Sequence, residues 1–216
     1  MESNGVLVCG ASGHAKVVID IIEQQGRCRI AGLIDDNPKL QGQKFCGYRI
    51  VGGFDQLNRN TYKSYRIIIA VGENRARKKL CKKLASLEYQ FITAVHPSAQ
   101  IGRSVSIGSG TMIMANVVVN PDTKVGAHVI LNTGATIDHD CVIGDFVHIS
   151  PGAHIAGNVV IGELSHIGIG VNIIQGVKIG ENSLIGAGAA VVEDIPDDVI
   201  AVGVPAKIIK NKRGVL

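Results

Sequence analysis

Residues 137–162 read IDHDCVIGDFVHISPGAHIAGNVVIG, and an aliphatic side chain returns at every sixth position of this stretch. The same phase runs without interruption from Ile101 to Val191. All sixteen positions in this phase hold Ile, Val or Leu. A fixed short period sustained over 90 residues predicts a repeat architecture, in which each unit buries its apolar side against the next.

The residue two positions before each aliphatic is small or β-branched, as at Val129, Ala135 and Cys141. Because side chains alternate along a strand, both positions point inward, and each unit is a short strand followed by a turn. Three units then close a triangular coil of 18 residues. Gly often follows the aliphatic, and we expect it to serve a corner that needs unusual backbone angles. The predicted fold is a parallel β-helix of hexapeptide repeats, with the left-handed winding that this architecture has.

The first 95 residues follow a different pattern, in which strands alternate with helices. A buried-strand run precedes the Gly-rich stretch GASGHAK at residues 10–16, and an amphipathic helix follows it. Further strands are expected before Asp35 and in YRIIIAVGEN at residues 65–74, and residues 37–60 are expected to be a loop that reads the base or sugar. Such alternation predicts a small Rossmann-like parallel α/β domain over residues 1–95, followed by the β-helix over 96–216. His96-Pro97 marks the joint.

Composition excludes several classes of protein. The five cysteines form no CxxC pair, which argues against a disulfide framework or a zinc knuckle and favours a reducing, cytoplasmic setting. No apolar run approaches the length of a membrane span. The net charge of +4 is mild, and the basic run at residues 75–83 is interpreted as a solvated face or, next, as a contact to phosphate-bearing small molecules. Without interleaved aromatic residues, nucleic acid is not an expected partner.

GASGHAK follows a strand and opens a helix, where free backbone N–H groups and the helix dipole attract a phosphate. Asp35 ends the next strand, where an acidic side chain can take a ribose hydroxyl or a base edge. His14 and Gly72 are expected at the same edge of the sheet. The stretch is neither GxGxxG nor a Walker A loop, so a redox dinucleotide site is not supported. An ordinary strand-to-helix turn remains an alternative.

His139 is the best candidate for a general base. Its phase places it at a corner, pointing outward, between Asp138 and Asp140. A carboxylate that holds one imidazole nitrogen fixes the tautomer and raises the basicity of the other nitrogen. A surface histidine without a function remains an alternative, as does a zinc site made by His139, Asp140, His148 and His154.

The six-residue period also predicts which way the side chains of His148, His166 and Cys141 point. His148 and His166 differ by 18 residues, so they are expected to stack on adjacent coils and to point outward. Cys141 falls on a small inward position, which argues against a catalytic thiol despite its nearness to His139.

The sequences GASGHAK, LIDD, AVGEN, LNTGATIDHDCVIGDFVHISPGAHIAGNVVIG and AVGVPAKIIK together resemble the sugar O- and N-acyltransferases typified by sialic acid O-acetyltransferase and the UDP-4-amino-sugar N-acetyltransferase of the bacillosamine pathway. The resemblance covers nearly the whole chain. It implies that His139 is the general base and Asp140 the residue that orients it. It implies that acetyl-CoA contacts His148, Ile169 and Ala187. It implies that the nucleotide part of the substrate contacts Ser12, Gly13, His14, Asp35, Asp36 and Gly72.

The resemblance also implies a homotrimer with active sites in the grooves between neighbouring prisms. The function expected from it is transfer of acetyl from acetyl-CoA, without a metal, to a nucleotide-activated 4-amino-4,6-dideoxy sugar, a step of glycan or polysaccharide biosynthesis. O-acetylation of a sialic acid or related sugar is the alternative within the class. A zinc-dependent β-helix that hydrates carbon dioxide and a scaffold without catalysis are alternatives outside it. UDP, GDP and CMP sugars are not distinguished.

Overall fold

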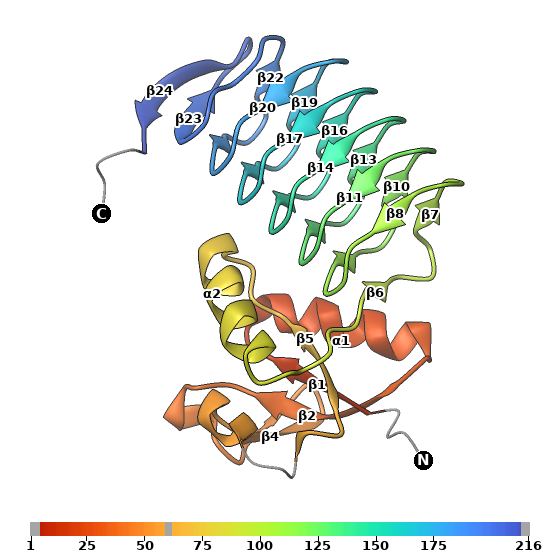
Figure 1. Ribbon diagram of the computed structural model, residues 1–216, viewed down its shortest axis with the longest axis vertical. Coiled ribbons are helices and arrows are strands. Elements are labelled where there is room, and N and C mark those ends of the chain that lie inside the picture. The colour runs from red at the N-terminus through yellow and green to blue at the C-terminus, as the bar shows by residue number, and fades with distance from the viewer. Residues whose placement is uncertain (1–4, 59–61, 213–216) are drawn as a thin grey trace. The chain divides into compact units, whose positions relative to one another are not determined.

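The computed structural model describes residues 5–58 and 62–212, and the chain divides into two compact units, residues 1–97 and 98–216 (Figure 1). The first unit is built on a mainly parallel sheet, and the second is a stack of short strands in repeating coils. Among the described residues, no helix has both the length and the apolar character needed to cross a membrane.

The N-terminal unit has a sheet with strand order β3-β4-β2-β1-β5, in which only the β3–β4 pair is antiparallel. Its regular elements are β1 (Gly5–Cys9), α1 (Gly13–Gln25), β2 (Arg29–Ile34), β3 (Lys44–Phe45), β4 (Tyr48–Gly52), β5 (Arg66–Ile69), α2 (Asn74–Ala85) and β6 (Ala94–Val95), with 3-10 turns η1 (Pro38–Leu40) and η2 (Phe54–Asn58). Strand β1 is buried along its whole length, as its apolar run predicts. Leu7, Ile34, Ile67 and Leu84 join one core cluster that holds the sheet to α2.

The chain reverses its direction of travel across the sheet at β1. It passes from β1 to β2 on one side, continues to β4, and returns to β5 on the other side of β1. In open parallel sheets, ligands bind outside the carboxyl ends of the strands at such a switch point. The loops after β1 and β5 both lie at this point.

The segment expected as a loop at residues 37–60 instead contains two short strands of the sheet, β3 and β4, and the two 3-10 turns η1 and η2. Strands β3 and β4 form a hairpin, and β4 pairs with β2. The turn at Cys46 and Gly47 has left-handed φ values of 47° and 82°, which lets two short strands reverse tightly. Residues 59 and 60 of the expected loop lie outside the described residues. The prediction failed because short polar strands give a weak periodic signal.

The C-terminal unit is a triangular prism with three parallel sheets as its faces. The β13 face consists of β7 (Gln100–Ile101), β10 (Val118–Val119), β13 (Thr136–Ile137), β16 (His154–Ile155), β19 (Asn172–Ile173) and β22 (Ala190–Val191). The β14 face consists of β8 (Ser106–Ile107), β11 (Lys124–Val125), β14 (Val142–Ile143), β17 (Val160–Ile161) and β20 (Lys178–Ile179). The β15 face contains β9 (Met112–Ile113), β12 (Ile130–Leu131), β15 (His148–Ile149), β18 (His166–Ile167), β21 (Leu184–Ile185) and β23 (Val199–Val202), with β24 (Lys207–Asn211) antiparallel to β23.

The 18-residue coil predicted from the period is confirmed by the strand register. Val118 pairs with Thr136, and Ile130 pairs with His148, so strands 18 residues apart are hydrogen-bonded neighbours. The predicted inward positions Ala135 and Cys141 have no exposed surface. Small and branched aliphatic side chains fill the prism because a coil of two-residue strands leaves no room for larger ones.

The glycines that follow the aliphatic positions have a different role from the one expected. The left-handed backbone angles fall two residues later in the unit, for example at Asp122 (φ 64°) and Asp140 (φ 59°). Gly144 instead lies against the next coil, since a Cβ there would be 2.7 Å from the backbone nitrogen of Glu163. Close approach of one coil to the next, rather than an unusual φ, requires glycine at this position.

Replacing Gly144 by Ala should therefore destabilise the β-helix by about 1–3 kcal/mol, the usual cost of an overpacked site, because the nearest neighbours of the new methyl group are backbone atoms. Urea unfolding followed by circular dichroism measures this loss. Gly176→Asn is the matched control, because Gly176 has φ 74°, a Cβ at this position would meet no atom within 4 Å, and Asn tolerates such angles. Equal stability of the two variants would contradict this account of the glycines.

Candidate active site

The candidate base lies at the corner between the β13 and β14 faces, immediately after β13. His139 Nδ1 is 2.7 Å from Asp140 Oδ2, and the two side chains are 54% and 53% exposed. A carboxylate only accepts, so Nδ1 carries the proton and Nε2 presents its lone pair. Asp140 takes the left-handed turn position, a conformation that Asp tolerates better than most residues, and this directs its carboxylate back to the ring.

A second carboxylate fixes the backbone of the same corner. Asp138 Oδ1 accepts hydrogen bonds from the His139 backbone N–H (2.9 Å) and from Asn120 Nδ2 (2.8 Å). These bonds, the one from Asn120 first, lower the pKa of Asp138, so the residue stays anionic beside the imidazole. Asn120 lies one coil below Asp138, in register with it, and thereby ties the corner to its neighbour.

The ring of His139 lies over the backbone of the next coil. A Cβ added at Gly157 would be 2.7 Å from His139 Cε1 and 2.8 Å from Nε2. The Asn158 N–H also donates to the His139 carbonyl at 3.0 Å. Gly157, which follows His139 by 18 residues, has no side chain and therefore leaves the space that the imidazole occupies.

The hydrogen bond that His139 donates to the Asp140 carboxylate raises the pKa of His139 above its ordinary value, with smaller contributions from the charges of Asp138 and Asp140. A base must be unprotonated, so kcat/KM should fall as the pH drops through this raised pKa. Asp140→Asn should move that acid limb to lower pH, because the pKa of His139 returns toward its usual value. It should also lower the plateau about tenfold, the factor that one charge-assisted hydrogen bond carries.

The pH profile of kcat/KM for the wild type and Asp140→Asn measures both effects. Asp122→Asn is the matched control, because Asp122 holds the same left-handed corner position one coil below, next to Pro121. An acid limb that stays in place in Asp140→Asn would contradict the assigned role.

His148 and His166 stack on the β15 face, as their 18-residue separation predicts. Their ring centroids are 4.6 Å apart with an interplanar angle of 14°. His148 Nε2 is 3.3 Å from Asn132 Nδ2, and His166 Nε2 is 2.9 Å from Ser150 Oγ. The Asn132 Oδ1 accepts from the Thr133 N–H, which orients the amide so that its NH₂ group faces His148. His148 Nε2 is then an acceptor, and its proton is on Nδ1.

The two residues predicted to contact acetyl-CoA besides His148 share one corner. Ile169 and Ala187 lie between the β15 and β13 faces on successive coils, and the Gly188 N–H donates to the Ile169 carbonyl at 2.8 Å. Ile169 is 61% exposed, which leaves an apolar ridge open to a ligand.

The chain does not bring all of these residues into one site. His139 lies at the corner opposite the β15 face, so His148 stands on the far side of the prism from it. A site that uses both histidines requires two chains.

Cys141 is not available as a nucleophile, as expected from its phase. Its side chain is buried, and burial raises the pKa of the thiol. Its Sγ is 3.2 Å from the Ala156 carbonyl oxygen. For the zinc alternative, the described residues contain no group of three His, Cys, Asp or Glu side chains placed to hold a metal ion.

The N-terminus of α1 stands at the switch point of the first unit. Ser12 is the N-cap residue and makes no side-chain capping bond, which leaves the first N–H groups of the helix for another acceptor. The N-terminus of α2 is different, because the Glu73 carboxylate already accepts from the Arg75 and Ala76 N–H groups. Of the two helices, α1 is therefore the one open to a phosphate.

Asp35 and Asp36, the two residues after β2 that are predicted to contact the nucleotide, both accept hydrogen bonds from backbone N–H groups. Asp35 accepts from the Ala11 N–H (2.8 Å) and the Asn37 N–H (2.9 Å), so it holds the Gly-rich loop to β2. Asp36 accepts from the Phe54 N–H at 2.7 Å, at the start of η2. Contacts of either carboxylate to a ligand stay a prediction.

A buried arginine, expected from its sequence to lie on a solvated face, organises the loop after β5. Arg77 has no exposed surface, and its Nη1 donates to the carbonyls of Val71 (3.0 Å) and Gly72 (2.9 Å). Burial, and then the charge of Arg77, lowers the pKa of His14 to about 4, so His14 is neutral at pH 7. Arg77 lies on the helix face of Cys81 and Leu84, and that spacing was the signal for its burial.

Comparisons with known proteins agree with this architecture over about 95% of the chain. A family model described as PglD N-terminal domain matches residues 5–84, and one described as bacterial transferase hexapeptide (six repeats) matches residues 104–139. The acetyltransferase domain of PglB from Neisseria gonorrhoeae is 37% identical, with a TM-score of 0.89, over 95% of this chain and 100% of that chain. The chain belongs to the hexapeptide-repeat sugar acetyltransferases.

Other members of this acetyltransferase family show what related chains bind. PerB from Caulobacter crescentus, whose structure is a complex with CoA and GDP-perosamine, is 40% identical with a TM-score of 0.90 over 95% of this chain and 97% of that chain. UDP-N-acetylbacillosamine N-acetyltransferase of Bacillus subtilis is 40% identical over 111 residues, so the match spans 51% of this chain and 51% of that curated relative. The predicted family and fold class, an α/β domain followed by a left-handed β-helix, are confirmed.

Proposed function

We propose that this protein transfers the acetyl group of acetyl-CoA to the C4 amine of a 4-amino-4,6-dideoxy sugar carried on a nucleoside diphosphate. The observation that carries the proposal is the corner at His139. There an imidazole that is 54% exposed has its Nδ1 hydrogen-bonded to Asp140, which leaves Nε2 as the nitrogen with the free lone pair. The names of the relatives support an amine rather than a hydroxyl as acceptor, since both curated and solved relatives act on or bind amino sugars.

Transfer is direct. The neutral amine attacks the thioester carbonyl carbon with its lone pair, a C–N bond forms, and the carbonyl electrons move to oxygen. His139 Nε2 takes the proton from the nitrogen, and Asp140 and Asp138 stabilise the imidazolium. When the tetrahedral intermediate collapses, the C–S bond breaks and the CoA thiolate leaves with the proton that His139 returns. No acyl-enzyme forms, in keeping with the burial of Cys141.

The N-terminal unit is proposed to hold the nucleotide. The diphosphate would accept hydrogen bonds from the first N–H groups of α1, beside Ser12 and Gly13, where the helix dipole favours negative charge. Neutral His14 adds a polar ring without a charge that competes with Arg77. Gly72, fixed by Arg77, lies after the neighbouring strand.

A homotrimer is proposed because one prism lacks a complete site. His139 of one chain and His148, Ile169 and Ala187 of a second chain would face each other across a groove between two prisms. The β14 face offers an apolar contact surface for this assembly, since Val142 and Val160 point outward and are 42% and 38% exposed. Acetyl-CoA would run along this groove, with its pantetheine arm on the Ile169 ridge.

The test is thiol release from acetyl-CoA with a panel of acceptors: UDP- and GDP-linked 4-amino-4,6-dideoxy sugars, their 4-hydroxy counterparts, and free sialic acid. We expect turnover with one of the nucleotide amino sugars and none with its 4-hydroxy counterpart. Turnover with sialic acid alone would move the assignment to O-acetylation. Thiol release that no acceptor increases would overturn the proposed function.

A further inference from the structure

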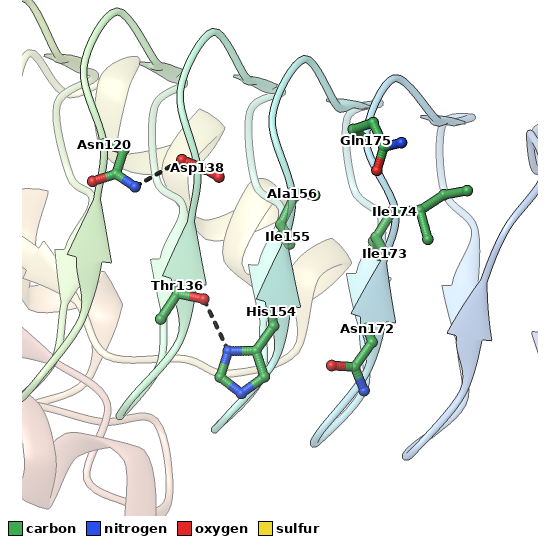
Figure 2. Close-up of a pocket in the computed structure, with 10 residues that line it drawn as sticks. All are labelled: Asn120, Thr136, Asp138, His154, Ile155, Ala156, Asn172, Ile173, Ile174 and Gln175. Atoms are coloured by element: carbon green, nitrogen blue, oxygen red, sulfur yellow. Dashed lines mark hydrogen bonds between the residues drawn. The ribbon is translucent and has the colours of Figure 1, made fainter.

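The hollow on the β13 face contains Asp138, directly before His139, and belongs to the candidate active site (Figure 2). Another pocket, of about 470 Å³, lies in the N-terminal unit, and the reaction described above uses none of its residues. A volume of several hundred cubic ångströms is typical of small-molecule sites. The polar side chains that line this pocket come from Gln25, Arg27, Cys28, Arg66, Gln90 and Thr93.

The pocket lies at the amino edge of the sheet. Strands β1, β2 and β5 are parallel, so they begin at the same edge, with the start of β1 between the starts of the other two. Arg27 belongs to the turn between α1 and β2, and Arg66 is the first residue of β5. The stretch GASGHAK follows the carboxyl end of β1. This pocket and the proposed nucleotide site therefore lie at opposite ends of the same strands.

Backbone hydrogen bonds fix the outer wall of the pocket. The segment after α2 runs beside the start of β5, where the Ile67 N–H donates to the Gln90 carbonyl at 3.0 Å. The Ile92 N–H in turn donates to the Ile67 carbonyl at 2.9 Å. Because this wall is paired with the sheet, the residues that it contributes to the pocket have a fixed position.

The charge of the lining indicates an anionic ligand. The described residues that line the pocket include two arginines and no Asp or Glu. Burial raises the pKa of the Cys28 thiol, and the positive charge of Arg66 opposes this shift, so Arg66 and Cys28 face the same space. A guanidinium group is a planar fork of donors that matches the oxygens of a phosphate or carboxylate.

The two glutamines of the lining narrow the class of anion. In the parts of the chain that the structure describes, the side-chain amides of Gln25 and Gln90 make no hydrogen bond. Each amide both donates and accepts. A sugar hydroxyl also does both, whereas an ionised phosphate or carboxylate accepts only. The lining therefore matches a phosphate group that is attached to carbons carrying hydroxyls.

We propose that this pocket binds a sugar phosphate at a site separate from those of the substrates. The phosphate lies between Arg27 and Arg66, and the ring hydroxyls contact the amides of Gln25 and Gln90. The proposal does not depend on the proposed function, because it uses no residue of the candidate active site.

The test uses the full chain and has two independent readouts. Calorimetry measures binding of a panel of hexose 1- and 6-phosphates, with inorganic phosphate and free glucose as the two halves of the ligand. Peptide mass spectrometry measures the rate at which iodoacetamide alkylates Cys28, which is half-buried in the pocket. Cys46, exposed in the β3–β4 turn, is the control within the same chain.

We expect a hexose phosphate to bind with a dissociation constant of about 1 mM or lower, and more tightly than inorganic phosphate or glucose. At saturation it should slow alkylation of Cys28 several-fold and leave that of Cys46 unchanged. A hexose phosphate that binds only at the nucleotide site would leave Cys28 unprotected, which would overturn the proposal. Absence of binding by the whole panel, or equal affinity for inorganic phosphate, would overturn it as well.

Charge-removing variants locate the phosphate. Arg66→Gln and Arg27→Gln should each weaken binding about tenfold, the effect of one charge-assisted hydrogen bond. Arg29→Gln is the matched control, because Arg29 is exposed at the start of β2, at the same edge of the sheet, and does not line the pocket. Circular dichroism checks the fold, and Arg27 in its exposed turn provides a second variant if Arg66→Gln unfolds. Equal affinity of the Arg27 and Arg29 variants would contradict the assigned phosphate position.

Discussion

His139→Ala should lower kcat by about 10²- to 10⁴-fold at pH 8, with KM for both substrates changed little. The imidazole acts on the amine as the C–N bond forms, so its loss removes stabilisation of the transition state rather than of the bound substrates. The residual rate should lose the acid limb of the wild-type pH profile, because that limb reports the protonation of His139. Steady-state kinetics from pH 6 to 9 measure all three effects.

Added imidazole provides the control for this variant. Removal of the side chain leaves a space at an exposed corner, so free imidazole should restore part of the rate in His139→Ala and none in the wild type. Unchanged circular dichroism and an unchanged oligomeric state would exclude a folding defect. A variant that keeps more than about half of the wild-type kcat would show that His139 is not the base.

Gly157→Ala should lower kcat on the order of 10²-fold without removing any catalytic group. The added methyl would lie 2.7 Å from His139 Cε1 and 2.8 Å from Nε2, so the exposed imidazole must move while the backbone stays. A displacement of about 1 Å at a reacting group costs on the order of 10²-fold, because the base no longer meets the amine in line. KM for the nucleotide sugar and for acetyl-CoA should stay within about twofold of the wild type.

A double-mutant cycle with His139→Ala decides whether Gly157 acts through the imidazole. If it does, Gly157→Ala costs nothing further once the ring is absent, and the two effects are strongly non-additive. Additive losses would mean that the methyl group distorts the corner itself, and Gly157 would then not be a positioning residue for His139.

The fold of the β-helix could be predicted in detail because its period leaves little freedom. Once six residues make one unit and three units make one coil, every inward position and every strand pair follows, as the Val118–Thr136 register confirms. The role of the corner glycines could not be predicted, because the sequence alone does not separate a glycine needed for its φ from one needed for close approach. Gly144 is of the second kind.

The N-terminal unit was predicted less completely, for reasons of pattern strength. The buried strands β1 and β5 are continuous apolar runs and give a clear signal. The β3–β4 hairpin alternates short polar and apolar residues, and its burial depends on pairing with β2, a distant segment. The charge of Arg77 predicts an exposed side chain, whereas its position on the apolar face of α2 buries it.

The candidate site likewise has a part that the sequence predicts and a part that only the structure reveals. His139 and its carboxylate neighbours are adjacent in the sequence, so their constellation could be recognised before the structure. Asn120 and Gly157 support that corner from the coils below and above, 18 residues from Asp138 and His139 respectively. Both supporting residues could therefore have been predicted by counting one coil of 18 residues in each direction along the sequence. The separation of His139 from His148 on opposite sides of the prism required the order of the three faces.

The most direct test of the central claim is the NMR spectrum of the product formed from acetyl-CoA labelled with ¹³C in its carbonyl group and the nucleotide 4-amino sugar that supports turnover. We predict a labelled amide carbonyl coupled through nitrogen to the C4 proton of the sugar, with the hydroxyls unmodified. A labelled ester on any sugar hydroxyl, or label found on the protein in place of the sugar, would contradict direct transfer to the amine.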